Sequence, residues 1–320
     1  MSSGRARALG VLAFSLAVLP TKALAADIAV GPSVIVNAQL VSGSLTIRVW
    51  NLSQVRIVTD GRIGWRHLGA AQIQPRIPTQ IDFWAQTTPT PRGDITLPAE
   101  SFTLPPLPGL HDAIVARGYG QTTITVPEGT ALIVGRISSS GSVFVSDYRG
   151  TLVATTNAGT IDVQSFAGTA YLQALRGRIF VGDSTFDRVR ARSGVGPVIF
   201  SSCRASQIDA SAVVGAVIYD DGMLGQGPVH FAAEFGDIAV GVAGAPTAVR
   251  HMTTGDTTVT FGAGRIVTAT SAHGSIFTYS GKLSEHPEFL ARWPRGGVLL
   301  RARGPGFTGY RQRRPPFRYR

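Results

Sequence analysis

A repeat of about nineteen residues constrains the fold of this 320-residue chain more than any other feature. Its template is Gly-x-apolar-x-apolar, and successive glycines lie 18 to 21 residues apart. Alternation with period two is typical of a β-strand, and the glycine before it is typical of a turn, whereas a helix needs a period of 3.6. The segments are 141–145, 159–163, 177–181, 196–200, 215–219, 236–240, 255–259 and 274–278.

A second set of short apolar runs lies between these segments. Two short strands per repeat, joined by tight turns, describe a flattened coil that adds one strand to each of two parallel sheets per turn. The sequence therefore predicts an all-β fold, a parallel β-solenoid of about eight rungs. The second-sheet runs are 150–154, 168–172, 187–191, 206–210, 227–231, 247–251 and 264–268.

The same alternation predicts which side chains point inward, because neighbours in a strand face opposite sides. On the first sheet we expect the inward positions to run from Val143 and Val145 to Ile276 and Thr278. On the second sheet we expect them to run from Leu152 and Ala154 onward. Near the end of the repeat, the expected inward pair Thr257 and Val259 belongs to the first sheet. The expected inward pairs of the second sheet there are Val249 with His251 and Ile266 with Thr268.

The N-terminus has the pattern of a secretory signal peptide. Arg5 and Arg7 precede the apolar stretch Ala8–Leu19, and Ala23-Leu24-Ala25 has the small-x-small pattern of a cleavage site. The apolar stretch is too short to span a membrane as a helix. We therefore expect export of the mature chain to the periplasm or the cell surface.

The remaining chain divides by composition. Strand-like runs follow the signal peptide, and a segment with six prolines between 87 and 109 is typical of a linker or a surface crossing. Ser284 is placed to cap a short helix that closes the last rung. The expected parts are a signal peptide (1–25), an N-terminal β segment (26–86), the proline-rich linker (87–120), the solenoid (121–281), the capping helix (282–293) and an Arg-rich tail (294–320).

The net charge of +11 is concentrated at the ends of the chain. Residues 26–288 hold 18 basic and 19 acidic residues, whereas 289–320 hold nine arginines and no acid. Arginines interleaved with aromatic residues suit phosphate or polyanion binding, and the alternative is a solvated end without a partner. After export the available anions are lipid headgroups, lipopolysaccharide and acidic glycans, so nucleic acid is not expected. The candidate anion-binding residues are Arg301, Arg303, Arg311, Arg313, Arg314, Arg318 and Arg320.

Two segments resemble a large bacterial family of exported, adhesin-like β-solenoid proteins. ITVPEGTALIV (124–134), with the Gly-x-Val/Ile-x-Val strands after it, resembles the body of that family, and VSGSLTIRVWNLSQVRIVTDG (41–61) is similar to its opening strands. The resemblance covers 41–61 and 121–281 and implies an exported, non-enzymatic solenoid. It implies no catalytic residues, and the proline segment and the tail depart from the family pattern.

Motifs of known chemistry are missing from the sequence. It has no Walker loop, no HExxH or other paired histidine spacing, no GxSxG elbow and no calcium-roll repeat. No cofactor and no metal are therefore predicted. Cys203 is the only cysteine, so no internal disulfide is possible, and we expect it to be a small buried or turn residue.

Outward positions of the second sheet form the one candidate catalytic row. Arg190, Asp209, His230 and Arg250 are expected on four consecutive rungs, about 5 Å apart. One interpretation is a polysaccharide lyase or hydrolase, and the other is a solvated ladder of alternating charge. A glycosidase needs two carboxylates, and only Asp209 stands in this row. The full row is Val153, Tyr171, Arg190, Asp209, His230, Arg250 and Val267.

The corresponding row of the first sheet is apolar. Either another part of the chain covers it, with 60–120 as the expected cover, or it is a face for a protein partner or self-association. The sequence thus favours an exported, non-catalytic structural or interaction protein of the cell envelope, with the polysaccharide-active enzyme as its rival. The row is Phe144, Asp162, Phe180, Ile199, Ile218, Ala239, Thr258 and Phe277.

Overall fold

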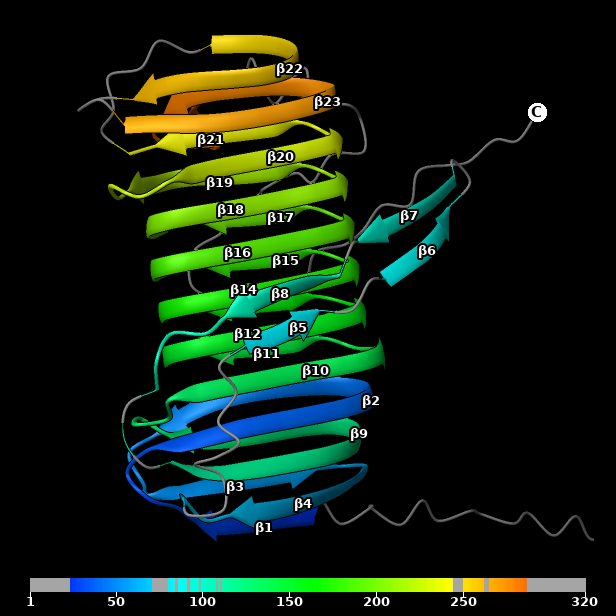
Figure 1. The fold of residues 1–320 in the computed structure, drawn as a ribbon, viewed down its shortest axis with the longest axis vertical. Helices are drawn as coiled ribbons and strands as arrows, with labels where there is room; N and C mark the ends of the chain where they lie inside the picture. Colours follow the sequence, from blue (N-terminus) through cyan, green and yellow to red (C-terminus); the bar gives the residue numbers. More distant parts are fainter. Residues whose placement is uncertain are drawn as a thin grey trace, which may run out of the picture.

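The computed structural model describes residues 24–70, 80–83, 86–90, 93–97, 99–107, 109, 111–243, 250–261 and 265–286. Within these ranges the chain is all-β, as predicted. Nineteen strands form one sheet in which parallel pairing dominates, and two further sheets have two strands each (Figure 1). A 3-10 turn at Leu283–Glu285 is the helical element whose bounds are described, and no described helix has the length and apolar character needed to cross a membrane.

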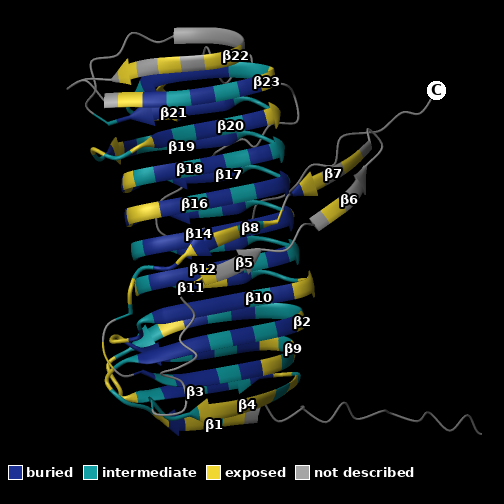
Figure 2. Ribbon diagram, viewed as in Figure 1, coloured by how far each residue is buried: buried dark blue, intermediate teal, exposed yellow. Residues whose placement is uncertain are grey.

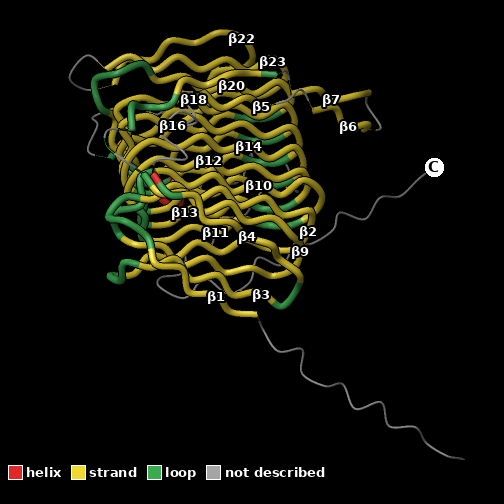
Figure 3. The backbone as a smooth tube through the Cα atoms, turned by 60° about the horizontal axis from the view of Figure 1, so that its bottom comes forward, coloured by secondary structure: helices red, strands yellow, loops and turns green. Residues whose placement is uncertain are grey.

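The central strands form two columns, because each strand pairs in parallel with the next strand but one. Figure 3 shows the resulting layers from a second direction. The long-strand column contains β10 (Leu132–Ser140), β12 (Arg149–Ala158), β14 (Ala167–Arg176), β16 (Thr185–Val195), β18 (Arg204–Val214) and β20 (Val229–Phe235). The short-strand column contains β11 (Val143–Ser146), β13 (Ile161–Gln164), β15 (Ile179–Gly182), β17 (Val198–Ser201), β19 (Val217–Leu224) and β21 (Ile238–Val242).

The inward register predicted for these columns is confirmed. Buried residues follow the columns, while exposed ones gather on marginal strands such as β4 and β7 (Figure 2). Aromatic rings continue the core from rung to rung, with centroids 5.3 to 6.4 Å apart between Tyr148, Phe166, Phe186, Phe200, Tyr219 and Phe231. Successive short-strand partners that are fully buried include Val143, Ile161, Ile179, Val198, Val217 and Ile238.

The turns at the two corners of each layer contain different kinds of residue with positive φ. At one corner the repeat glycines from Gly141 to Gly215 have positive φ, and a Cβ on Gly159 would collide with the carbonyl oxygen of Gly141 in the rung before it. Only glycine fits such a close backbone approach. The opposite corner is occupied by polar residues with φ between 46° and 57°, a conformation that Asp tolerates better than most residues. They are Asp147, Ser165, Asp183, Ser202 and Asp221.

The N-terminal segment contributes a complete layer. β2 (Val34–Trp50) spans both columns, pairing in parallel with β9 (Asp112–Pro127) on one side and with β10 and β11 on the other. Chain order and stacking order therefore differ, because β2 lies between β9 and β10. Beyond β9 the stack ends in antiparallel pairs formed by β1 (Leu24–Ala29), β3 (Gln54–Thr59) and β4 (Arg62–Leu68). The expected signal peptide lies mostly in residues 1–23, outside the described residues, and β1 includes its last two expected residues, Leu24 and Ala25.

The described part of 87–120, expected to be a linker or a surface crossing, contains several strands. β5 (Gln80–Phe83) pairs with β8 (Glu100–Thr103), and β6 (Gln86–Thr90) forms a hairpin with β7 (Gly93–Leu97) that projects from the stack (Figure 1). β9 then fills much of the remaining range. Proline is tolerated in edge strands, which is why a proline-rich composition did not prevent strand formation here.

The predicted rung at 255–259 is also wrong. β22 (Arg250–Phe261) pairs antiparallel with β23 (Arg265–Ser280), and β23 itself continues the stack on β20 and β21. In the first part of β23 the inward register differs by one residue from the prediction, because Val267 is buried and Ile266 is 61% exposed, whereas Ile276 and Thr278 are buried as predicted. The reason is pairing, because Ala269 lies beside the inward Phe231. The side chains of Val249, His251, Thr257 and Val259 lie outside those described.

The segment expected to begin a capping helix at Ser284 forms a 3-10 turn. A 3-10 turn spans Leu283–Glu285, so Ser284 lies inside it instead of capping it, and 287–293 lie outside the described residues. Leu283 is buried, and its backbone N–H donates to Asp220 Oδ1 at 2.7 Å. The hydroxyl of Tyr279 donates to the same oxygen at 3.1 Å. Asp220 therefore fixes the turn to the end of the short-strand column.

Candidate functional site

The predicted charged row exists on the long-strand column, but it is shorter than expected. Arg190, Asp209 and His230 are direct partners on β16, β18 and β20, and Tyr171 precedes them on β14. His230 is followed by Thr268, because β23 and not β22 continues the column. Arg250 pairs with Thr278 instead, so it is not part of the row, and neither is the buried Val267.

A strap, defined as residues 99–107 and containing β8, lies across this face (Figure 1). Phe102 stacks on Tyr171 with ring centroids 5.1 Å apart, and the Tyr171 hydroxyl donates to the Thr103 carbonyl at 3.2 Å. The strap and the face share one apolar cluster. It comprises Ile35, Phe102, Leu104, Ala113, Leu132, Val134, Val153 and Tyr171. We had expected 60–120 to cover the apolar row of the first sheet, which is the short-strand column. The described part of this segment instead covers the long-strand column. We call the covered surface the strapped face.

Ion pairs connect the strap to the charged row. Glu100 contacts Arg190 at 2.9 Å and also pairs with Arg192. The Nε of Arg190 lies 2.9 Å from Asp209 Oδ2, and Asp209 Oδ1 lies 3.4 Å from His230 Nδ1. Glu100 is thus the second carboxylate that the sequence pattern lacked. It could not be found from the repeat, because it comes from a segment with no repeat at all.

Contacts within the charged row shift the pKa values of Asp209 and His230 in opposite directions. The hydrogen bond with His230, followed by the charge of Arg190, lowers the pKa of Asp209 below its ordinary value. The same hydrogen bond raises the pKa of His230. Since a general acid at neutral pH needs a raised carboxyl pKa, Asp209 is suited to an ionic contact and not to proton donation.

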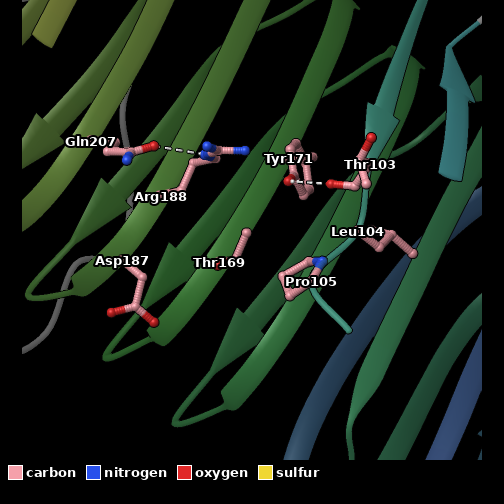
Figure 4. A pocket seen from close by; sticks show the side chains of 8 residues that line it. All are labelled: Thr103, Leu104, Pro105, Thr169, Tyr171, Asp187, Arg188 and Gln207. Carbon is pink, nitrogen blue, oxygen red and sulfur yellow. Dashed lines mark hydrogen bonds between the residues drawn. The ribbon is translucent and has the colours of Figure 1, made fainter. Parts of the chain in front are cut away.

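A pocket of about 340 Å³ opens beside the strap (Figure 4). The end of the strap forms one wall, and side chains from β14, β16 and β18 form the other. The guanidinium of Arg188 donates to the Gln207 amide oxygen at 2.8 Å, across neighbouring rungs. The lining residues are Thr103, Leu104, Pro105, Thr169, Tyr171, Asp187, Arg188 and Gln207.

A β-bulge places Asp187 at this pocket. Gly168 pairs with Phe186 and Thr169 with Arg188, so Asp187 has no opposite residue on β14. Sequence reasoning missed the pocket, but the signal was present. The glycine spacing rises from 18 (Gly159 to Gly177) to 19 (Gly177 to Gly196), and Asp187 is the added residue.

The apolar row of the short-strand column is placed as expected, except for Thr258. Phe144, Asp162, Phe180, Ile199, Ile218, Ala239 and Phe277 are successive partners, whereas Thr258 pairs with Thr268 on β23. Phe144 is 40% exposed, but Ile199, Ile218 and Phe277 are buried. Leu283 and Tyr279 pack with this buried end. The exposure that an interaction face requires is therefore pronounced only at Phe144.

The other candidate residues have simpler surroundings. Cys203 is buried, as predicted, and burial raises the pKa of its thiol to about 12, which opposes nucleophilic reactivity. Within the described ranges, no group of three or more His, Cys, Asp or Glu side chains could hold a metal ion. The tail arginines 301–320 lie outside the described residues.

Comparison with protein-family models, with curated proteins and with solved structures found no match.

Proposed function

We propose that the chain is an exported, non-catalytic interaction protein of the bacterial cell envelope, built as a parallel β-solenoid of the adhesin-like kind. The two columns of parallel strands, with nearly constant register and turns every 18 to 21 residues, support the solenoid. The segment 124–134, which carries the family resemblance, joins β9 to β10 within this stack. The expected signal peptide supports export.

The observation that carries the non-catalytic assignment is the ionic network of the strapped face. Arg190 and Arg192 pair with Glu100, and Arg190 also pairs with Asp209. Both carboxylates are thus engaged in holding the strap and the row together. A hydrolase needs one carboxyl group with a raised pKa, and the pKa of Asp209 is lowered.

We propose two contact regions for envelope partners. The Arg-rich tail binds anionic material, namely lipid headgroups, lipopolysaccharide or acidic glycan, because each arginine near an anionic surface contributes about 1 kcal/mol at physiological salt. The exposed end of the apolar row, at Phe144, is available to a protein partner or to self-association. No nucleic acid is proposed as a ligand, since 26–288 sum to a charge of −1.

Co-sedimentation with vesicles and isolated envelope material tests this proposal. The mature chain should bind anionic vesicles and release no glycan fragments, and raising salt from about 0.1 to 0.5 M should release it. A chain ending after Trp293 should lose binding and keep its melting temperature. Binding that survives both truncation and high salt would assign the contact to Phe144 and its neighbours.

A polysaccharide lyase or hydrolase is the second candidate, and one observation favours it. The strap places Glu100 beside Arg190 and supplies the wall that a bare row lacks. The decisive assay incubates wild type and Asp209→Ala with envelope glycans and measures new reducing ends and unsaturated products. Turnover by wild type that is lost in a folded Asp209→Ala variant would replace the non-catalytic proposal.

A further inference from the structure

The pocket beside the strap has the size of a small-ligand site. Its volume of about 340 Å³ lies at the lower end of the range for such sites, which begins at about 300 Å³. This is room for one compact ring and not for an extended chain. The pocket is open on one side, so a ring that belongs to a longer polymer could enter while the polymer continues along the surface.

The lining combines hydrogen-bonding groups with an apolar wall. Asp187 offers acceptors and Arg188 offers donors, and their charges cancel. Gln207 and Thr169 offer both kinds of group. The apolar groups are Leu104 and Pro105 of the strap and the ring of Tyr171, which comes from β14 like Thr169 (Figure 4). A neutral ring with hydroxyl groups at its edge and C–H groups on its faces matches this lining, whereas a phosphate would meet the carboxylate of Asp187.

The bulge explains how neighbouring residues serve one pocket. Adjacent residues of a regular strand point to opposite faces, so Asp187 and Arg188 would normally separate. The extra residue interrupts the alternation, and both side chains line the same space. Bulges are known to re-aim side chains beside binding sites.

The pocket is also held in shape before any ligand arrives. The Arg188–Gln207 hydrogen bond fixes the wall formed by the long-strand column, and the Tyr171–Thr103 hydrogen bond joins that wall to the strap. The Glu100 ion pairs hold the strap next to the column. Such preorganisation lowers the entropy that a ligand must lose on binding.

We propose that this pocket binds one neutral pyranose unit of an envelope glycan, held by Asp187, Arg188 and Gln207 against the wall of the strap. This inference rests on the proposed role as an envelope interaction protein, because it names the chemistry of one ligand. It assigns Glu100 as a positioning residue, which keeps the strap in place without touching the sugar.

Saturation-transfer NMR on the full mature chain tests the proposal with glucose, galactose and N-acetylglucosamine, and with glucuronate as a charged comparison. At least one neutral sugar should bind at millimolar concentration and more tightly than glucuronate. Asp187→Ala and Gln207→Ala should each weaken binding about tenfold, because each removes a hydrogen bond from a desolvated ligand. Gln164→Ala, on the short-strand column, is the matched control and should change nothing.

Glu100→Gln gives an independent readout. It should weaken sugar binding while also making the strap more susceptible to protease, and excess sugar should restore protection. Absence of binding for all three neutral sugars, tighter binding of glucuronate, or equal binding in Asp187→Ala and Gln207→Ala would overturn the inference. If the inference fails but the chain still binds envelope material without turnover, the proposed function stands. If a neutral sugar binds the pocket as expected but a bound glycan is cleaved, the proposed function fails and the pocket stands.

Discussion

The strapped face and the apolar row are the two outward surfaces of one stack, and each is closed by a segment outside the repeat. The strap is joined to the long-strand column by ion pairs and by the Phe102–Tyr171 contact. The buried end of the apolar row is closed by Leu283, which Asp220 holds by a hydrogen bond. The comparison teaches that the same repeat can present a polar or an apolar surface, depending on which segment later packs on it.

Both surfaces depend on the inward register of the strands, so the largest effect is expected there. Val181→Asp places a carboxylate in a fully buried position and should cost more than about 3 kcal/mol in unfolding free energy. Asp162→Val, at an outward position of the neighbouring rung, should change stability by about 1 kcal/mol, because it loses only a 3.9 Å ion pair with Arg178 and a hydrogen bond from Gln164, both partly exposed. Chemical denaturation measures both, and equal losses would show that the register is wrong.

The closure of the apolar row gives the next largest effect. Leu283→Ala should cost about 2–4 kcal/mol, because Leu283 is buried among Ile218, Phe277 and Tyr279. Its amide, which donates to Asp220, should also lose protection from hydrogen exchange. Since the contact is apolar, the loss should be the same at low and high salt. A strongly salt-dependent loss would contradict the description of this face.

The closure of the strapped face should respond in the opposite way. Glu100→Gln removes the carboxylate beside Arg192 and one of the two beside Arg190, which keeps Asp209, and both guanidinium groups are partly exposed, so we expect a loss of about 1 kcal/mol. Proteolysis within the strap should accelerate, and high salt should reduce the difference between variant and wild type. Glu234→Gln, at an exposed position of β20, is the control and should leave strap proteolysis unchanged. A loss as large at high salt as at low salt would assign the closure to Phe102 packing alone.

The sequence could predict the repeat-based parts of both faces, because their signal is local. Val143 and Leu152 are inward because alternation with period two is read directly from neighbouring residues. Ile266 was misassigned, since the segment 250–280 has the same alternation but folds as a hairpin. The difference depends on which strand pairs with β20, and alternation alone does not determine a partner.

The candidate site was predictable only in part, for the same reason. Arg190, Asp209 and His230 follow from the repeat, whereas Glu100 reaches them from a segment 90 residues away from Arg190 in sequence. No pattern within residues 99–107 specifies such a contact. Asp187 was only partly predictable. The spacing change from 18 to 19 marks an extra residue, but it does not indicate that this residue lines a pocket.

The smallest expected effect separates the two faces by their response to acid. On the strapped face, the pKa of Asp209 is lowered by its hydrogen bond with His230, so its stabilising contribution is present above the unfolded value of 3.8 and is lost as pH falls through the folded value. At the apolar row, burial raises the pKa of Asp220, so stability increases as pH falls through its folded value toward 3.8.

Asn variants should therefore diverge when unfolding free energies are measured between pH 3 and 7. Asp209→Asn should be less stable than wild type at pH 7 and should approach it in acid. Asp220→Asn keeps an oxygen acceptor for Leu283, removes a penalised charge, and should lose any advantage over wild type as pH falls. Each difference should stay below about 1 kcal/mol, because both carboxyl groups are partly solvated. If both variants changed in the same direction with pH, the two carboxyl groups would share one environment, and the electrostatic contrast between the faces would be wrong.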